Sequence, residues 1–237
     1  MLNRLPESSL RKASIPDGRS VAGTASGRQP DPMRPQERWS AAWRSVGAQP
    51  PEELLSQLVA RYSEPHRFYH TLQHLEECFA VLAPATHCAG HLAEVELALW
   101  FHDAIYDTRA QDNEEQSARW AEQALLAAGA SQVIAGRIGK LVLVTKHDAV
   151  PEGQDARLLV DVDLSILGAA EERFAEYERQ VREEYSWVPE AAFRQGRARI
   201  LASFLERPTI YSTSWFAGRL EGRARANLQR SLGKLIV

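Results

Sequence analysis

Nearly every segment from Glu37 to the C-terminus repeats apolar residues at spacings of three and four, which is the period of an α-helix. Several of these segments begin with a proline or end with a glycine, as helices commonly do. No stretch alternates apolar and polar residues, and no hairpin turn signal occurs. The strand-like "VLVTK" lies inside a longer helical run. The sequence therefore predicts an all-α protein, a single-domain helical bundle.

The expected helices are defined by their apolar periodicity and by the glycines Gly129 and Gly168 as helix ends. They lie at 37–47, 51–63, 91–107, 113–130, 131–148, 154–169, 170–188, 189–206 and 217–236.

Residues 1–35 differ from the rest of the chain. They are rich in Gly, Pro, Ser and Arg and have no apolar period. Such a segment cannot bury enough apolar surface to offset its ordering entropy, so we predict a disordered tail at 1–35 and a folded domain at 36–237. Met33 suggests the hypothesis that translation starts there. An intact mass beginning at Met1 would refute it.

Composition excludes several classes of protein. The net charge of −3, from 28 basic and 31 acidic residues among 237, predicts neither a nucleic-acid groove nor a membrane-binding patch. The chain has no apolar run of membrane-spanning length and no secretory signal. Its two cysteines, Cys78 and Cys88, indicate free thiols in a reducing compartment. We expect a cytoplasmic protein.

Histidines and aspartates interrupt the apolar segments at a few places. In "RFYHTLQH", His70 and His74 are four residues apart and share a helix face if the helix includes both. In "WFHDAIYD", His102 and Asp103 are adjacent, about 100° apart on a helix. Both can therefore reach one ion only where the helix meets a cavity.

The stretch "LLVDVDLSIL" adds Asp161 and Asp163 to this set. An unpaired carboxylate is costly to bury, so such residues need a cation or several hydrogen-bond donors. A single histidine on an apolar face is usually a hydrogen-bonded core residue, and one His-Asp pair is weak evidence. Interruptions of separate apolar helices by residue types that bind metals favour one shared polar centre.

These motifs resemble those of the HD-domain superfamily of metal-dependent phosphohydrolases. The stretches "YHTLQHLEE", "WFHDAIYD", "DNEEQSA", "VTKHD", "DVDLSILG", "REEY", "GRARIL" and "ARANL" are similar to the bacterial branch of predicted HD-superfamily phosphohydrolases. The resemblance extends from Glu52 to Leu235. It implies a divalent metal ion and the hydrolysis of a small phosphorylated substrate.

The resemblance also implies roles for single residues. The "YH…H" arrangement is similar to the start of the catalytic region of cyclic-nucleotide phosphodiesterases, where the first histidine is the general acid and the second binds metal. This makes His70 the proton donor and His74 a ligand, although His70 as the ligand stays open. Asp163 resembles the last metal aspartate, with Asp161 as the alternative. The metal set implied is His74, His102, Asp103 and Asp163.

The chain also departs from the family pattern. Many HD hydrolases carry further histidines that hold a second metal, but here the corresponding stretch contains Asn113 and Glu114. His147 is either a late ligand or a helix cap. We expect one strongly bound metal and leave a second, weaker site open. Glu114 is predicted to orient the attacking water or to hold a ligand histidine, or else to be an ordinary acid in a first helical turn.

Arg67 and Lys146 are candidates for phosphate binding, because they are cations close to motif residues. The alternative is that both are solvated surface charges. Asp107 is expected to position Tyr106 or to cap a turn. His66, His87 and His91 have no supporting context and are expected at the surface.

The sequence thus predicts a phosphohydrolase that uses Mn, Fe, Co, Ni, Zn or Mg to cleave a small phosphate ester such as a nucleotide. His70 would protonate the departing oxygen, and Asp103 would also take a proton from water. Two alternatives remain. One is a non-catalytic binding module in which the metal only joins helices. The other is a di-iron oxygenase of the HD fold, similar to inositol oxygenase, which needs more histidines than the chain supplies.

Overall fold

The computed structural model describes residues 35–236, and within this range it is all-helical, as the sequence predicts. Its α-helices are α1 (Pro35–Ser45), α2 (Leu54–Tyr62), α3 (Leu72–Leu82), α4 (Leu92–Phe101), α5 (Asn113–Ala127), α6 (Gln132–Leu143), α7 (Gln154–Asp163), α8 (Glu171–Glu184), α9 (Glu190–Glu206) and α10 (Ser214–Ile236). Three 3₁₀ helices are η1 (Ala83–Cys88), η2 (Val144–Lys146) and η3 (Leu164–Gly168). None of these helices could span a membrane. Apart from Pro35, the predicted tail and Met33 lie outside the described range.

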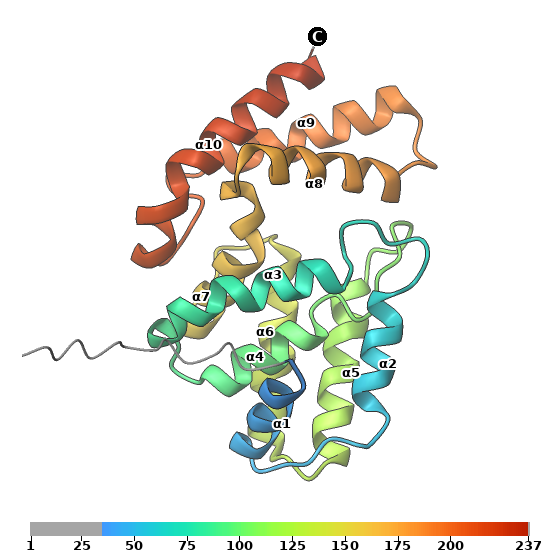
Figure 1. Cartoon of the computed structure of the whole chain (residues 1–237), viewed down its shortest axis with the longest axis vertical. Helices are drawn as coiled ribbons and strands as arrows, with labels where there is room; N and C mark the ends of the chain where they lie inside the picture. Colours follow the sequence, from blue (N-terminus) through green and yellow to red (C-terminus); the bar gives the residue numbers. More distant parts are fainter. Residues whose placement is uncertain (1–34, 237) are drawn as a thin grey trace, which may run out of the picture. The chain divides into compact units, whose positions relative to one another are not determined.

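Helices α1 to α7 form a first group (Figure 1). Helix α4 lies inside it, in contact with α1, α3, α5, α6 and α7. Its sequence, "LAEVELALWF", is apolar almost all round, which is typical of a helix buried on every side. Trp39 of α1 packs edge-on against Trp100 of α4 with ring centroids 5.3 Å apart. Burial of this kind fixes the end of α4, and with it the residues that follow.

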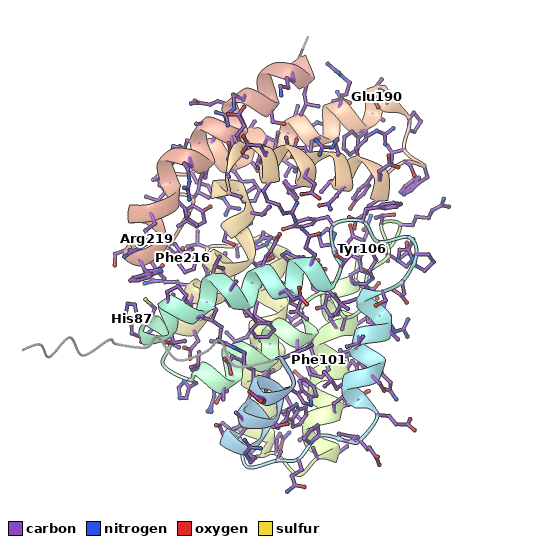
Figure 2. The ribbon with its side chains drawn as sticks, viewed as in Figure 1. His87, Phe101, Tyr106, Glu190, Phe216 and Arg219 are labelled. Carbon is purple, nitrogen blue, oxygen red and sulfur yellow. The ribbon has the colours of Figure 1, made fainter. Side chains whose placement is uncertain are left out.

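Helices α8, α9 and α10 form a second group, joined to α7 through η3 (Figure 1). Helix α10 packs against both α9 and η3. The turn before α10 is held by Glu221, whose carboxylate accepts hydrogen bonds from the backbone N–H groups of Ile210 and Tyr211. The side chains of the two groups meet near Tyr106, which lies below α8 in Figure 2.

Two helix boundaries differ from the sequence-based expectation, and both matter for the site. Helix α4 ends at Phe101, so His102 is its C-cap and Asp103 begins an irregular loop. Helix α3 begins at Leu72, so His70 precedes the helix that carries His74. The condition for these two histidines to share a helical face, a helix that includes both, is therefore not met.

Gly168 marks the closest approach between η3 and α10. A Cβ atom placed there would lie 2.7 Å from the Leu220 Cβ and 3.0 Å from the Leu220 carbonyl oxygen. Replacement by alanine should lower the free energy of unfolding by about 1–3 kcal/mol, because the neighbouring backbone has to move. Urea denaturation followed by circular dichroism measures this.

Gly222 provides the matched control, since it lies within α10 and a Cβ there meets nothing within 4 Å. Gly222→Ala should stabilise the protein by about 0.5–1 kcal/mol through helix propensity. Equal effects of the two substitutions would contradict the packing described for Gly168.

Candidate metal centre

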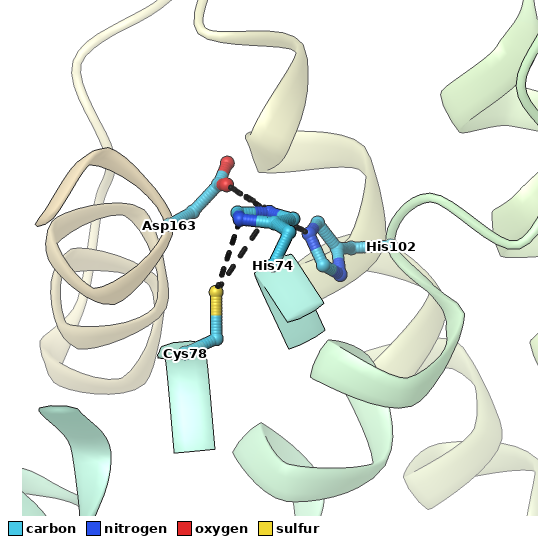
Figure 3. Close-up of side chains that lie close together, drawn as sticks. All are labelled: His74, Cys78, His102 and Asp163. Atoms are coloured by element: carbon cyan, nitrogen blue, oxygen red, sulfur yellow. Dashed lines mark hydrogen bonds and ion pairs between the residues drawn. The ribbon is translucent and has the colours of Figure 1, made fainter. Parts of the chain in front are cut away.

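Side chains from three separate parts of the chain converge in the first group of helices. His74 and Cys78 of α3, His102 after α4 and Asp163 at the end of α7 point toward one another (Figure 3). The two histidine Nε2 atoms are 3.1 Å apart, and His74 Nε2 is 3.2 Å from Asp163 Oδ1. His74 and His102 are both buried. These residues form a candidate metal-binding cluster.

Asp103 extends the cluster on one side. Its Oδ2 atom lies 3.0 Å from His102 Nε2 and 3.6 Å from His74 Nε2. Adjacent ligands around an ion with bonds of ~2.0–2.1 Å are separated by about 2.8–3.0 Å in octahedral geometry and about 3.3–3.4 Å in tetrahedral geometry. The donor atoms of the predicted ligands are 3.0–3.7 Å apart, which is close to this spacing.

The orientation of His102 suits a ligand. Its Nδ1 donates to the Leu99 carbonyl oxygen at 2.7 Å, so the neutral ring presents the Nε2 lone pair to the centre. Burial lowers the pKa of His102, but the Asp103 and Asp163 carboxylates outweigh burial and raise that pKa to about 9. A proton on His102 therefore compensates the carboxylates until a cation takes its place.

Cys78 is a neighbour that the sequence reading treated only as a structural thiol. Its Sγ atom lies 3.8 Å from both ring nitrogens of His74, one helical turn earlier on α3. Burial raises the pKa of the Cys78 thiol well above its ordinary value. Charges of His102 and His70 overcome burial and lower the pKa of Asp103. An ionised carboxylate is favoured over a protonated thiol as a metal donor, so the assignment of Asp103 as a ligand stays a prediction beside Cys78, which the cluster includes.

His70 is held by a residue that the sequence reading did not identify. Its Nδ1 donates to Oε2 of Glu184 at 2.8 Å, and Oε1 of Glu184 accepts the backbone N–H groups of Phe68, Tyr69 and His70 at 2.8–2.9 Å. The Tyr106 hydroxyl donates to the same carboxylate at 2.8 Å, and its ring stacks on His70. His70 is thus fixed beside the cluster.

The charge of Glu184 also changes the protonation of His70. Burial raises the pKa of Glu184, but the His70 charge and the donated hydrogen bonds outweigh it and bring this pKa to about 2. Burial lowers the pKa of His70, and the Glu184 carboxylate reverses this and raises it above the ordinary value. Glu184 belongs to "REEY", one of the stretches that carry the family resemblance.

The two aspartates of α7 face different surroundings. Asp161 is fully buried and accepts hydrogen bonds from the backbone N–H groups of Ser212 and Thr213 and from the Thr213 hydroxyl, all at 2.6–2.7 Å. It therefore caps the start of α10. Asp163 lies two residues later and reaches His74 and His147. The geometry favours Asp163 over Asp161 as a ligand.

His147 follows η2 and has a left-handed backbone, with φ of 58°. Its Nε2 donates to Oδ2 of Asp163 at 2.9 Å, and its Nδ1 is buried without a hydrogen-bond partner among the described residues. A non-glycine residue in this conformation carries strain of about 1 kcal/mol or more, which is common at functional sites. His147 is the C-cap of η2, which agrees with one of the two sequence-based alternatives. The other alternative, a late metal ligand, stays a prediction.

Arg67 does not lie where a substrate could reach it. Its guanidinium is fully buried, pairs with Glu64 and donates to the carbonyl oxygens of His70, Asp103 and Ala104 at 2.6–3.2 Å. It ties the turn of His70 to the loop of Asp103. This placement gives no support to the predicted phosphate contact.

The remaining candidates line a pocket of about 680 Å³ that includes His70, Asp103 and Asp163. Lys146 lies on its wall with its ammonium group paired to Glu115 at 2.5 Å. Glu114 also lines it, and burial raises the pKa of this carboxyl group. Asn113 also lines the pocket, but its side-chain amide accepts a hydrogen bond from the Asp107 N–H and donates one to the Asp107 carbonyl oxygen.

No family model, curated protein or solved structure matches the chain at a significant level. The resemblance to the HD-domain superfamily therefore depends on the motifs and on the buried His/Cys/His/Asp cluster.

Substitutions of the two α7 aspartates distinguish the ligand role predicted for Asp163 from the capping role of Asp161. Asp163→Ala should weaken metal binding by about a hundredfold or more, because it removes a charged donor. Asp161→Ala should retain the metal and lower the free energy of unfolding by about 1–3 kcal/mol, because three donors at the start of α10 lose their acceptor. Metal analysis and denaturation test both. Metal loss in the Asp161 variant alone would reverse the assignment.

The pH dependence of stability should reveal the proton on His102. Because the pKa of His102 is raised from 6.5 to about 9 in the folded protein, its contribution to stability is complete below pH 6.5 and is lost as the pH rises through about 9. The chelator-treated protein should thus lose thermal stability over this range, whereas metal affinity should increase. A metal-free His102→Asn variant with the same loss would contradict this origin.

Proposed function

We propose that the protein is a metal-dependent phosphohydrolase acting on a small phosphate ester. The observation that carries the proposal is that the buried cluster borders a pocket which also contains His70. Asp103 and Asp163 line that pocket while His74 and His102 lie behind them, so a substrate in the pocket would meet the open side of the cluster.

His74, His102, Asp103 and Asp163 would hold the divalent ion. Their two imidazole nitrogens and two carboxylates suit Mn, Fe, Co, Ni or Zn better than Mg, which prefers oxygen donors alone. When bound, such an ion supplies Lewis acidity toward phosphoryl oxygens and lowers the pKa of water.

His70 is the proton donor in this proposal. Glu184 fixes the ring through Nδ1, which leaves Nε2 as the atom that can give a proton to the departing oxygen. The carboxylate also keeps the ring protonated to a higher pH by raising its pKa. This pairing supports general acid catalysis over the alternative that His70 is a ligand, since a ligand would have to be unprotonated.

Two carboxylates on the pocket wall could receive or orient the proton of the attacking water. Asp103 is ionised, because nearby histidines lower its pKa, and it lies at the cluster. Glu114 has a pKa raised by burial and stands further along the wall, where it suits the orientation of water. We assign proton acceptance to Asp103 and orientation to Glu114.

The pocket also bears on the two alternative functions. A metal that only joined helices would need no opening to a cavity of this size, and the contact between Glu184 and His70 would have no use. A di-iron oxygenase needs more imidazole ligands; beyond His74 and His102, the described residues add only His147 in contact with a ligand carboxylate. Hydrolysis fits the donor set better than either.

Metal reconstitution followed by a panel of phosphomonoesters and phosphodiesters tests the proposal. His70→Asn should lower kcat by about 10²–10⁴ while the metal content stays at the wild-type level, because only the proton donor is lost. His91→Ala is the control, since His91 pairs with Asp155 away from the cluster and should behave like wild type. A protein that binds no metal, or hydrolyses no ester with any metal, would rule out the proposal.

Glu184→Gln provides a second readout of the same assignment. Without the carboxylate the pKa of His70 falls, so the basic limb of the pH–kcat profile should move to lower pH. An unchanged profile would remove His70 from the role of general acid.

A further inference from the structure

Cys78 is the member of the cluster that the proposed hydrolytic site does not use. It lies one helical turn after His74 on α3, and its sulfur points toward the His74 ring (Figure 3). Residues at this spacing share one face of a helix. Histidine pairs that bind zinc commonly have about three to five residues between them, and His74 and Cys78 have this spacing.

The sulfur of Cys78 faces polar groups although the residue lies in the core. Cys78 is only 1 % exposed. Its Sγ atom is 3.8 Å from both ring nitrogens of His74, and among the described residues it has no other hydrogen-bond partner. A cysteine that only filled the core would behave as a small apolar residue and would have no need to face an imidazole.

The positions of the donor atoms suit a four-coordinate ion. Those of His74, Cys78, His102 and Asp163 all lie within 4.8 Å of one another. A tetrahedral zinc ion with a Zn–S bond of ~2.3 Å and Zn–N bonds of ~2.0–2.1 Å separates sulfur from nitrogen by about 3.5–3.6 Å. The 3.8 Å between the Cys78 sulfur and His74 Nε2 is close to that value. The four side chains can therefore be the ligands of one tetrahedral ion.

Asp103 and Cys78 offer this ion two different surroundings. Asp103 lines the pocket together with Asp163, whereas Cys78 does not line it and is buried inside the bundle. An ion bound with Asp103 would be open to the pocket. An ion bound with Cys78 would be enclosed by protein ligands. The cluster thus has two candidates for a fourth ligand beside His74, His102 and Asp163.

The two candidates also differ in the ions that they prefer. Carboxylate oxygen suits Mn²⁺ and Mg²⁺, whereas thiolate sulfur selects zinc and other thiophilic ions. The Cys78 thiol is protonated in the metal-free protein, because burial raises its pKa. A coordinated thiol loses its proton to solvent, so a thiophilic ion can still recruit this side chain.

We propose that Cys78 is the fourth ligand of thiophilic ions such as Zn²⁺. The complete set is then His74, Cys78, His102 and Asp163. Four protein ligands complete a tetrahedral zinc sphere and leave no position for water, which is typical of structural and not of catalytic zinc. Mn²⁺ takes Asp103 instead and stays open to the pocket. Zinc therefore occupies the cluster without supporting hydrolysis. The inference rests on the proposed function only for the role of the Asp103 set.

The absorption spectrum of the cobalt-loaded protein tests this set without turnover. Co²⁺ reports on zinc sites, because a thiolate ligand gives it a sulfur-to-metal charge-transfer band in the near ultraviolet that nitrogen and oxygen ligands do not give. The wild-type protein should show this band, and added Zn²⁺ should remove it by displacement. Cys78→Ser should lack the band. Cys88→Ser, the matched control at the second free cysteine, should retain it. Cys78→Ala, which places no hydroxyl in the core, should repeat the result independently of any effect of serine on folding.

Metal affinities distinguish a ligand from a core residue. Cys78→Ser should weaken Zn²⁺ binding about a hundredfold or more and change Mn²⁺ binding less than about threefold, because Mn²⁺ prefers oxygen donors. Asp103→Asn should weaken Mn²⁺ binding more than Zn²⁺ binding. A purely structural Cys78 would give equal losses for the two ions.

Three results would overturn the inference: a cobalt-loaded wild type without the band, a band that survives in Cys78→Ser, or equal losses of Zn²⁺ and Mn²⁺ affinity in that variant. These readouts are spectra and binding constants. The expected pattern in a protein that hydrolyses no ester would therefore support the Cys78 set and reject only the hydrolase.

Discussion

The structure is organised by the need to compensate carboxylates buried in an apolar bundle. Glu184 is satisfied by five donors, and Asp161 by three. Glu94 is paired with Arg137. Each of these acids joins elements far apart in the sequence. Apart from His70 Nδ1, their donors are backbone N–H, hydroxyl and guanidinium groups, which remain donors at any physiological pH.

Asp103 and Asp163 are compensated in a different way. Their nearest side-chain partners are histidine nitrogens, which donate only when the proton is on the nitrogen concerned. The same nitrogens become acceptors when the ring loses that proton. The bundle satisfies the other buried acids mainly with fixed donors but surrounds these two with imidazoles. A metal ion can take the place of the protons on those imidazoles.

The sequence predicted the helices and most of the cluster for a simple physical reason. A histidine or aspartate within "ELALWFHDAIY" or "LLVDVDLSIL" contradicts its apolar surroundings, so the pattern itself marks it. The end of α4 at Phe101 was predicted wrongly, and whether α3 includes His70 was left open, because hydrogen bonds from distant residues decide both. Helical periodicity contains no information about such partners.

The residues that the sequence did not reveal do not contrast with their neighbours in the sequence. Glu184 lies 114 positions from His70, in a highly charged helix where another glutamate attracts no notice. Cys78 reads as a small core residue of an apolar helix. Arg67 was predicted to contact phosphate because it lies close to a motif in the sequence. Such proximity does not determine which way a long side chain extends. Only tertiary contacts distinguish these cases.

The candidate metal cluster and much of the pocket lining come from different groups of helices. The cluster requires donors fixed to a few tenths of an ångström, and it is built between α3, α4 and α7, with His74 and His102 both buried. Helices α8 and α9 supply pocket residues such as Tyr177 and Phe204. Glu184 connects the two, since it stands at the end of α8 and holds the turn of His70. A displacement of α8 relative to α3 would therefore disturb the proton donor before it disturbed the metal ligands.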